Sequence, residues 1–526
     1  MDESTATGPG RDQAGPLDRR RFLRGVGGAS ALALAGGTGG LLAACGTDDG
    51  APAPTTLGPV GTTAPAEPTD RAWTQLAAML DGTVLRPGDA AYPQAALPSN
   101  LVYRDVRPPG IVRPAGAGDV QTTMRWAREE GIATVARSGG HSYAGYSTTS
   151  TGVVIDLSTL ATIDLDVDTG EATIGAGALL GDVDDATTPQ GWVVPAGRCR
   201  SVGIAGLLLG GGYGFNSRPF GLTSDNLVAT DLVTAAGELV TVTATEDPDL
   251  FWALRGGGGG NFGINVGFRV RAHQVTQAAV YSLTWTDRSV FGPVWSAFQD
   301  VVAGAPEGFS LHLVAANAQP SSGGDGRSLA VIGQHLGTAA ELRELLAPAL
   351  AVAEPASATI EDQDLAGATT FLAEPGDPDA FLSKSAFYDR LGEEAIDQVL
   401  DWIDRFPTSG VTGDFTVIAA GGAVDRIAPT ETAFVHRGVA YLNEGNASWP
   451  ADAAPSTADE VRAWIEDMYA ALADHLGPGA YQNFIDPTLD GWAAAYYGEN
   501  LARLSATKAR VDPDDHFRFA QSIPVG

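Results

Sequence analysis

The sequence predicts an α+β protein built from more than one structural unit. Its 526 residues are 44% hydrophobic and 8% aromatic, which is enough apolar material to bury large cores. Segments typical of strands and helices alternate from about Leu101. After about His273 the pattern changes to alternating strands and longer helices, which predicts a second α+β unit whose antiparallel sheet offers one face to a ligand.

The first unit contains one helix that the spacing defines well. Val120, Met124 and Ala127 recur at helical spacing within 119–131, and Gly131 ends the segment. The other expected elements of this unit are a helix at 72–80, strands at 102–106, 111–116, 133–140 and 152–160, a strand pair around an Asp-Thr-Gly turn at 161–177, a helix at 179–192, a hairpin-like pair at 226–243, and a helix, glycine run and strand at 250–273.

The same sequence patterns predict the helices and strands of the second unit and of the C-terminus. A final helix at 492–513 is stopped by Asp512 and Pro513. The remaining expected elements are strands at 279–286, 308–316, 328–336, 413–424 and 432–445 and a helix at 341–351.

The N-terminal residues predict an export signal. Arg19, Arg20 and Arg21 precede a weakly apolar, glycine-broken stretch that is too short to span a membrane. RRRFLR resembles a twin-arginine signal, which exports folded proteins, and Leu42-Ala43-Ala44-Cys45 resembles a lipobox whose cysteine is lipidated. The alternative is a soluble secreted protein that is cleaved nearby, with Cys45 incidental. In both cases the protein leaves the cytoplasm.

Composition changes then divide the chain into five parts. We expect a twin-arginine or lipoprotein signal at 1–45, a flexible linker rich in Ala, Pro, Thr and Gly at 46–70, a first domain at 71–273, a second domain at 274–475, and a C-terminal segment at 476–526.

Charge and cysteine content exclude several functions. The formal net charge is −31, which repels nucleic acid and anionic headgroups, so nucleic acid is excluded as a partner and a membrane is reached only through a lipid anchor. The two cysteines, Cys45 and Cys199, each have an explanation other than a disulfide. Motifs for zinc hydrolases, serine hydrolases and P-loop enzymes are missing, and no metal site is expected. Residues 172–181 come near a dinucleotide fingerprint but have one residue too many, so we interpret them as a strand and a tight turn.

Two glycine-rich turns carry the chemistry. RSGGHSYAG (137–145) contains His141, and PAGRCRSVGIAGLLLGGGYG (195–214) contains Cys199 between Arg198 and Arg200. Alone, the second turn is explained equally by a phosphate cradle or a buried inert thiol. If the arginine side chains face the thiol, they lower its pKa. The histidine is reactive as the neutral imidazole.

Together with LFWALRGGGGGNFG (250–263) and YYGENLARLSATKARVDPDDHF (496–517), these turns resemble the berberine bridge enzyme-like and oligosaccharide oxidase branch of the vanillyl-alcohol-oxidase type flavoproteins. The resemblance covers roughly 95–275 and the C-terminal 50 residues. It implies a PCMH-type FAD-binding domain of two α+β subdomains, a substrate domain with a large antiparallel sheet flanked by helices, and a C-terminal segment that returns to the FAD domain.

The resemblance also implies the cofactor and its contacts. FAD is expected to be covalently bound, with an 8α-histidyl bond at His141 and a 6-S-cysteinyl bond at Cys199. Glycines permit the close backbone approach that a diphosphate requires. The expected cofactor contacts are Arg137, Ser138, Gly139, Gly140, Ser142, Tyr143, Gly145, Val202, Gly203, Gly206, Gly210, Gly211, Gly212, Gly214 and Asn483.

The family's catalytic base is a tyrosine in a YxN segment, which places Tyr481 in that role in AYQNFID. A phenol needs a lowered pKa to act as a base near neutrality, through positive charge or hydrogen bonds; the alternative is a tyrosine that only packs at the domain junction. The chain departs from the pattern in two places. Phe484 replaces a second tyrosine, and the strand before Gly421 has Ile418, Ala419 and Ala420 where sugar-oxidising relatives carry an acidic residue.

The sequence thus predicts an exported, FAD-linked oxidoreductase that acts on a carbohydrate or other alcohol and uses dioxygen, as a monomer. Val202 lies where relatives control oxygen access, which favours an oxidase over a dehydrogenase. Lys384, His436 and Arg437 are interpreted as solvated surface residues, with a place on the substrate face as the alternative. Two other functions stay open: oxidation of a natural-product alcohol or amine, and a surface solute-binding lipoprotein.

Overall fold

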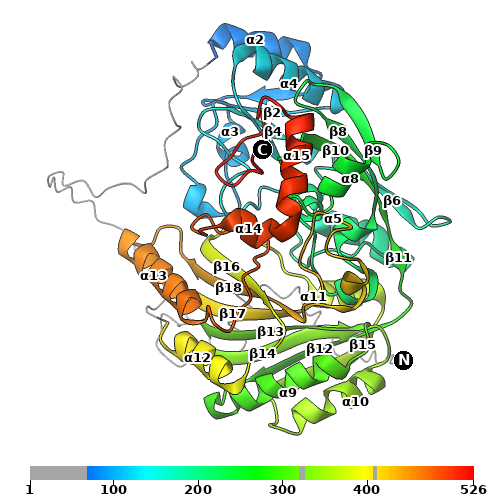
Figure 1. The fold of residues 1–526 in the computed structure, drawn as a ribbon, viewed down its shortest axis with the longest axis vertical. Helices are drawn as coiled ribbons and strands as arrows, with labels where there is room; N and C mark the ends of the chain where they lie inside the picture. The colour runs from blue at the N-terminus through cyan, green and yellow to red at the C-terminus, as the bar shows by residue number, and fades with distance from the viewer. Residues whose placement is uncertain (1–67, 319–325, 407–410) are drawn as a thin grey trace, which may run out of the picture.

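The structure is a computed structural model that describes residues 68–318, 326–406 and 411–526. These residues form four sheets with helices packed around them, so the predicted α+β class is confirmed (Figure 1). The predicted signal, including Cys45, and all but the end of the predicted linker lie outside the described residues. Among the described residues, no helix is long and apolar enough to cross a membrane.

A four-stranded sheet carries the histidine turn at the end of one strand. Its order is β1-β2-β4-β3; β1 pairs antiparallel with β2, whereas β2 and β3 both pair in parallel with β4. The predicted helix at 119–131 is confirmed as α4 (Ala117–Glu130), which ends where Gly131 has a φ of 68°, a conformation that favours glycine. The other elements are α2 (Asp70–Met79), β1 (Thr83–Leu85), α3 (Tyr92–Ala95), β2 (Gly110–Arg113), β3 (Thr134–Arg137) and β4 (Val153–Asp156).

A five-stranded antiparallel sheet lies next in the chain. Both predicted strand pairs form here, and the strand order is β5-β6-β10-β8-β9. Its strands are β5 (Ile163–Asp166), β6 (Glu171–Gly175), β8 (Leu227–Val233), β9 (Leu239–Thr243) and β10 (Ile264–Arg271). The connecting elements are α5 (Leu180–Thr187), β7 (Trp192–Val193), α6 (Ile204–Leu209), α7 (Ser217–Phe220) and α8 (Pro248–Ala253), and β7 pairs with β11 (His273–Gln274).

A seven-stranded antiparallel sheet of order β15-β12-β14-β13-β17-β18-β16 makes up the other half of the molecule. Four helices cover its outer face, as Figure 1 shows. The strands are β12 (Ala278–Trp285), β13 (Phe309–Ala318), β14 (Arg327–His335), β15 (Ser357–Gln363), β16 (Ala380–Tyr388), β17 (Thr412–Ala419) and β18 (Tyr441–Trp449). The covering helices are α9 (Phe291–Gly304), α10 (Ala339–Leu350), α12 (Glu393–Asp404) and α13 (Pro455–Ala471), and α11 (Leu365–Leu372) lies at the β15 side.

Alternation along these strands gives the sheet one apolar and one more polar face. On β17, Phe415 and Val417 belong to the large core under the helices. Their neighbours Thr416 and Ile418 line a cavity on the inner face. The sheet therefore presents a wall to the half of the molecule that carries the two glycine-rich turns.

The C-terminal segment returns to the first domain. Helix α15 (Leu501–Val511) lies beside α8, and α14 (Trp492–Tyr497) precedes it and packs against α15 (Figure 1). Lys508 is fully buried; its Nζ is 2.6 Å from Asp512 Oδ2 and donates to the carbonyl oxygens of Asn261 and Phe517. This buried ion pair fixes the end of the glycine run against the last residues of the chain.

Three expected elements differ from the structure. The strand at 102–106 is wrong, because Asn100 caps a short 3-10 helix there through the Val102 amide. The single helix at 492–513 is two helices, separated at Gly498, whose φ is 48°. The strand at 432–445 begins only at Tyr441, since the residues before it run irregularly.

Candidate active site

One cavity of about 460 Å³ is lined by residues of both glycine-rich turns and of the C-terminal tyrosine segment. His141 and Cys199 line it from the two turns, and Tyr481 lines it from the segment before α14. The inner face of the seven-stranded sheet closes the opposite side. The structure thus brings together the three residues that the sequence predicted for cofactor attachment and proton transfer.

The two turns pack backbone against backbone. Ser138 Oγ donates to the carbonyl oxygen of Ala176 at 2.6 Å, which ties the histidine turn to the five-stranded sheet. A Cβ on Gly139 would lie 2.3 Å from the amide nitrogen of Gly203 in the other turn. Only a residue without a side chain fits between them, which explains this glycine.

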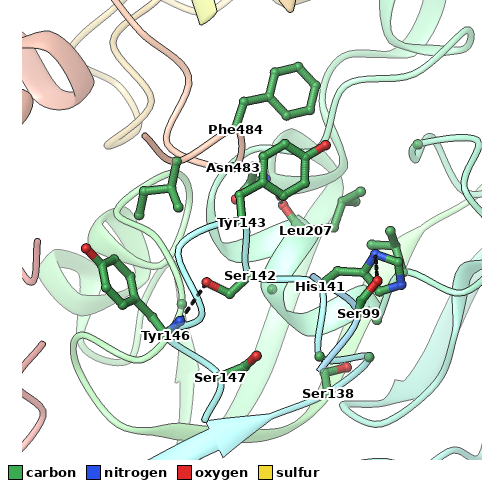
Figure 2. A pocket seen from close by; sticks show the side chains of 18 of the residues that line it. Ser99, Ser138, His141, Ser142, Tyr143, Tyr146, Ser147, Leu207, Asn483 and Phe484 are labelled. Atoms are coloured by element: carbon green, nitrogen blue, oxygen red, sulfur yellow. Dashed lines mark hydrogen bonds between the residues drawn. The ribbon is translucent and has the colours of Figure 1, made fainter. Parts of the chain in front are cut away.

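The His141 ring lies between two serine hydroxyls. Nδ1 is 3.2 Å from Ser99 Oγ, a contact drawn in Figure 2, and Nε2 is 2.9 Å from Ser201 Oγ. Burial lowers the pKa of His141 to about 4. The ring is therefore neutral near pH 7, the form that the sequence analysis required of it.

Cys199 has a different environment from the one expected. Burial and then the Glu374 carboxylate raise the pKa of its thiol to about 11. Arg198 pairs with Glu374 at 3.3 Å, and Arg200 pairs with Asp185 at 2.7 Å. Arg198 lowers the thiol pKa as expected, but burial and the Glu374 carboxylate outweigh it, and Arg200 is not among the groups that shift it.

Tyr481 lies in an aromatic enclosure with two donors aimed at its oxygen. Its hydroxyl accepts hydrogen bonds from the Gly212 amide at 2.7 Å and from Asn483 Nδ2 at 2.9 Å. The surrounding rings include Tyr213 at 5.6 Å and Phe484 at 5.0 Å between centroids. Burial raises the pKa of Tyr481 to about 12 although these hydrogen bonds lower it. The predicted hydrogen bonds are present, but they do not bring the pKa below that of a free phenol.

The sheet contributes a carboxylate that the sequence analysis missed. Glu444 lines the cavity from β18, and its Oε1 accepts from Tyr143 Oη at 3.0 Å and Asn446 Nδ2 at 3.1 Å. The family pattern pointed to β17, where Ile418 stands, whereas the acidic residue lies on the neighbouring strand opposite Thr416. The period-two alternation of YLNEGNASW places Glu444 and Asn446 on one face and could have revealed them.

Buried polar atoms without a partner in the described part of the chain indicate that the cavity holds a polar ligand. They belong to residues from several parts of the cavity wall: Ser147 Oγ, His312 Nε2, Asn446 Oδ1, Gln482 Oε1 and Gln521 Oε1. The backbone of Gly258, Gly259 and Gly260 also lines the cavity. This donor and acceptor set, with a glycine run that allows close approach, fits a large cofactor such as FAD. No group of three metal-ligating side chains occurs among the described residues.

The expected cofactor contacts divide into two groups. Those that line the cavity are Ser138, Gly139, Gly140, Ser142, Tyr143, Val202, Gly203, Gly206 and Asn483, several of which are labelled in Figure 2. Those that do not line it are Arg137, Gly145, Gly210, Gly211, Gly212 and Gly214.

The residues of the second group make contacts within the protein, and their assignment as cofactor contacts stays a prediction. Buried Arg137 pairs with Asp156 at 3.1 Å. A Cβ on Gly145 would lie 2.5 Å from the Tyr103 ring, and one on Gly214 would lie 1.7 Å from the carbonyl oxygen of Ala196.

The run 210–212 packs against the Tyr481 site. A Cβ on Gly210 would lie 2.0 Å from Asn483 Oδ1, and one on Gly211 would lie 3.4 Å from the Tyr481 ring. Gly212 donates its amide to the Tyr481 hydroxyl.

Three residues interpreted as solvated are largely buried, so that interpretation is wrong. Arg437 is buried and binds both carboxylate oxygens of Asp225. His436 stacks on Phe387 at 4.2 Å between centroids. Lys384 Nζ lies 2.6 Å from Asp486 Oδ2.

Comparison with known proteins places this geometry in a family. Residues 108–243 match the family model described as "FAD binding domain", and residues 480–524 match the one described as "Berberine and berberine like". An uncharacterized FAD-linked oxidoreductase of Bacillus subtilis, YgaK, is 33% identical over 455 residues, which cover 85% of this chain and 97% of that protein.

Solved structures give the same result. Wild-type BBE-like 1 of Physcomitrella patens is 29% identical with a TM-score of 0.78 over 86% of this chain and 99% of that one. Glucooligosaccharide oxidase of Acremonium strictum, described with a 6-S-cysteinyl, 8α-N1-histidyl FAD, is 27% identical with a TM-score of 0.78 over 86% of this chain and 99% of that one. An oxidoreductase family rules out the solute-binding alternative, and the chain belongs to the berberine bridge enzyme-like family of FAD-linked oxidoreductases.

Proposed function

We propose that the protein is an exported oxidase that holds FAD through two covalent bonds, at His141 and Cys199, and oxidises a carbohydrate or another alcohol. Dioxygen is the electron acceptor and hydrogen peroxide is the second product. The observation that carries the proposal is that His141, Cys199 and Tyr481 line one cavity whose opposite wall is a polar sheet face.

FAD, when bound, supplies the hydride acceptor. The chain supplies the groups that hold it: the two attachment side chains, the backbone of the glycine run at 258–260, and the unpartnered polar atoms of Ser147 and Gln521. The walls of the cavity would keep bulk water from the reacting atoms of the bound cofactor.

Tyr481 removes the hydroxyl proton of the substrate. As a base it must carry a negative charge on Oη, and the Gly212 amide and Asn483 Nδ2 both donate to that atom. Donors preorganised toward a developing charge stabilise it without reorganisation. Because the pKa of Tyr481 is about 12, the phenolate is the minor form at neutral pH, so the rate rises as the solution becomes alkaline.

The inner sheet face supports a substrate with several hydroxyl groups. Thr416, Glu444 and Asn446 present hydroxyl, carboxylate and amide groups to the cavity. Relatives named xylooligosaccharide oxidase and glucooligosaccharide oxidase support a carbohydrate as the first candidate.

A natural-product amine or alcohol is the second candidate. The Glu444 carboxylate in the cavity favours it, because a protonated amine forms a charge-assisted hydrogen bond with a buried carboxylate. Removal of the Glu444 charge should slow oxidation of a protonated amine more than oxidation of a neutral sugar, which distinguishes the two substrate classes.

Export and the acceptor complete the proposal. Val202 lines the cavity beside the attachment residues and supports access of dioxygen. The twin arginines and Cys45 support export of the folded protein and a lipid anchor at the cell surface, with a secreted form as the alternative. A covalently held cofactor suits a monomer that works away from the compartment where FAD is made.

A panel of sugars, alcohols and amines tests the activity in an oxygen electrode with peroxide detection. We expect oxygen uptake with at least one hydroxylated compound. Tyr481→Phe should keep the flavin absorbance and lose flavin reduction by that compound. Absence of uptake across the panel would contradict the oxidase proposal, and wild-type flavin reduction in Tyr481→Phe would remove Tyr481 from the role of base.

A further inference from the structure

Ser201 lies between the two attachment residues and touches both. Its Oγ is 2.9 Å from His141 Nε2 and 3.8 Å from Cys199 Sγ. A third contact runs to the other domain, since Ser201 Oγ donates to the carbonyl oxygen of Gly376 at 2.7 Å. One hydroxyl thus joins the histidine turn, the cysteine turn and the substrate domain.

These contacts determine where the His141 proton lies. A carbonyl oxygen only accepts, so the single hydroxyl proton of Ser201 is used by Gly376. Ser201 Oγ must then accept from His141, which puts the imidazole proton on Nε2. Nδ1 is left with its lone pair, toward which Ser99 Oγ donates. The remaining acceptor capacity of Ser201 Oγ is directed at the Cys199 thiol.

The Gly376 carbonyl is held by a strap, residues 374–379, that crosses from the substrate domain. The Arg200 amide donates to the carbonyl oxygen of Glu374 at 2.8 Å, and the Glu374 amide donates to that of Arg198 at 2.9 Å. At the other end, the Asp379 amide donates to the carbonyl oxygen of Ser99 at 3.1 Å. The strap therefore joins the backbone beside Cys199 to the backbone beside the His141 ring.

Gly376 fits tightly against one attachment residue and loosely against the other. A Cβ on Gly376 would lie 2.2 Å from Cys199 Sγ and 2.3 Å from Ser201 Oγ, but 3.6 Å from His141 Cε1. The first two distances are impossible contacts, whereas the last is an ordinary one. A side chain at position 376 would thus collide with the Cys199 thiol and the Ser201 hydroxyl but not with the His141 ring.

We propose that Ser201, oriented by the Gly376 carbonyl of the strap, is the positioning residue for both flavin bonds: it fixes the His141 proton on Nε2 so that Nδ1 bonds to the flavin, and it holds the Cys199 thiol. This inference rests on the proposed covalent attachment. It assigns to the substrate domain a role in loading the cofactor of the other domain.

Each flavin bond forms by a two-electron oxidation. At His141 a C–N bond to Nδ1 replaces one C–H bond of the 8α-methyl group, and the Nε2 proton, which faces Ser201 Oγ, is lost. At Cys199 a C–S bond replaces the C–H bond at ring carbon 6, and the thiol proton is lost. Each bond releases two electrons and two protons, and dioxygen takes them up as one hydrogen peroxide. After attachment Nε2 is only an acceptor, and a serine hydroxyl can rotate to donate to it.

The test is the attachment itself, measured by mass spectrometry of peptides from acid-precipitated protein expressed with adequate flavin. Wild type should give a peptide pair joined through one flavin, bonded to His141 and to Cys199. Ser201→Ala should lose the doubly linked species, and Ser201→Thr, which keeps the hydroxyl, should regain it. Gly376→Ala, whose Cβ would displace both the Cys199 thiol and the Ser201 hydroxyl, should also lose the doubly linked species.

Gly438→Ala is the matched control for Gly376→Ala. Gly438 has a φ of 72°, close to the 74° of Gly376, but nothing within 4 Å of its added Cβ. It carries the same backbone strain without the contact, and thermal unfolding of each variant identifies any that does not fold.

The outcomes separate this inference from the proposed function. Doubly linked flavin in Ser201→Ala at the wild-type level overturns the inference alone. Retention of both bonds in Gly376→Ala overturns the role of the strap. Wild-type protein that releases all its flavin on acid treatment overturns the inference together with the covalent part of the proposed function.

Discussion

Replacing Asn483 with alanine removes one of the two hydrogen bonds donated to the Tyr481 hydroxyl. Asn483 Nδ2 lies 2.9 Å from that oxygen, and the Gly212 amide lies 2.7 Å from it. A hydrogen bond to a charged group contributes about 1.5–3 kcal/mol, and about 1.4 kcal/mol is tenfold, so the phenolate fraction at a given pH should fall about 10- to 150-fold.

The assay is anaerobic reduction of the bound flavin by substrate, followed by absorbance at several pH values. Burial raises the pKa of Tyr481 to about 12, so the wild-type rate should rise with pH throughout the neutral range. The phenolate is the active form, and loss of a donor raises the pKa further. The Asn483→Ala rate should therefore be lower at every pH below that of full ionisation, and its rise should move to higher pH.

A double-mutant cycle distinguishes this role from a structural one. Asn483 Nδ2 also donates to the carbonyl oxygen of Leu207 at 2.9 Å, so the variant loses a packing contact as well. If Asn483 acts through the Tyr481 oxygen, its removal has little further effect in a Tyr481→Phe background. An equal loss in both backgrounds, or an unchanged pH profile in Asn483→Ala, would refute the reasoning.

Three further perturbations test other parts of the structure. Glu444→Gln keeps the shape of a cavity-lining side chain but removes its charge. The value of kcat/KM should therefore fall at least about tenfold for a protonated amine and less for a neutral sugar. Equal effects on both substrates would contradict the role assigned to Glu444. Asp512→Asn removes the buried carboxylate 2.6 Å from fully buried Lys508 and leaves only the partly exposed Asp515 at 3.5 Å. The free energy of unfolding should fall by about 3 kcal/mol in chemical denaturation, whereas an unchanged midpoint would contradict this. Gly203→Ala puts a Cβ 2.1 Å from Ser138 Oγ, which should separate the two turns and abolish flavin colour. The control Gly118→Ala, whose Cβ meets nothing within 4 Å, should keep the colour. A coloured Gly203→Ala protein would argue against the close packing of the turns.

Local patterns predicted much of the fold. Helix α4 was visible in its apolar spacing and its terminal glycine, and the β5–β6 and β8–β9 hairpins in their turn residues. The segment at 102–106 failed because a strand needs a partner, and its apolar residues instead follow an Asn100 cap. Partners depend on tertiary structure, which a short window of sequence does not contain.

The site was predictable to the extent that each residue carries its own signal. His141 and Cys199 stand in distinctive turns, and Tyr481 in a recognisable segment. The neighbours that set their chemistry come from distant parts of the chain: Glu374 lies beside Cys199, and burial raises the pKa of its thiol. The charge state of a group depends on such neighbours, and the sequence did not show that burial and Glu374 outweigh the lowering of the thiol pKa by Arg198.

Glycine-rich sequence was similarly ambiguous. The runs at 210–212 and 258–260 look alike, yet only the second lines the cavity. The first is needed because Asn483 and Tyr481 pack against it. Only the spatial arrangement distinguishes glycine that lines a cavity from glycine that packs against a side chain.

The central claim is that one flavin is bound covalently to both turns. Acid precipitation of the purified protein followed by intact mass measurement tests it directly. The account predicts a yellow pellet and a chain heavier by one FAD less four hydrogens, with His141→Ala and Cys199→Ala each keeping one bond and losing only two hydrogens. A colourless pellet with the mass of the bare chain, from protein expressed with adequate flavin, would contradict it.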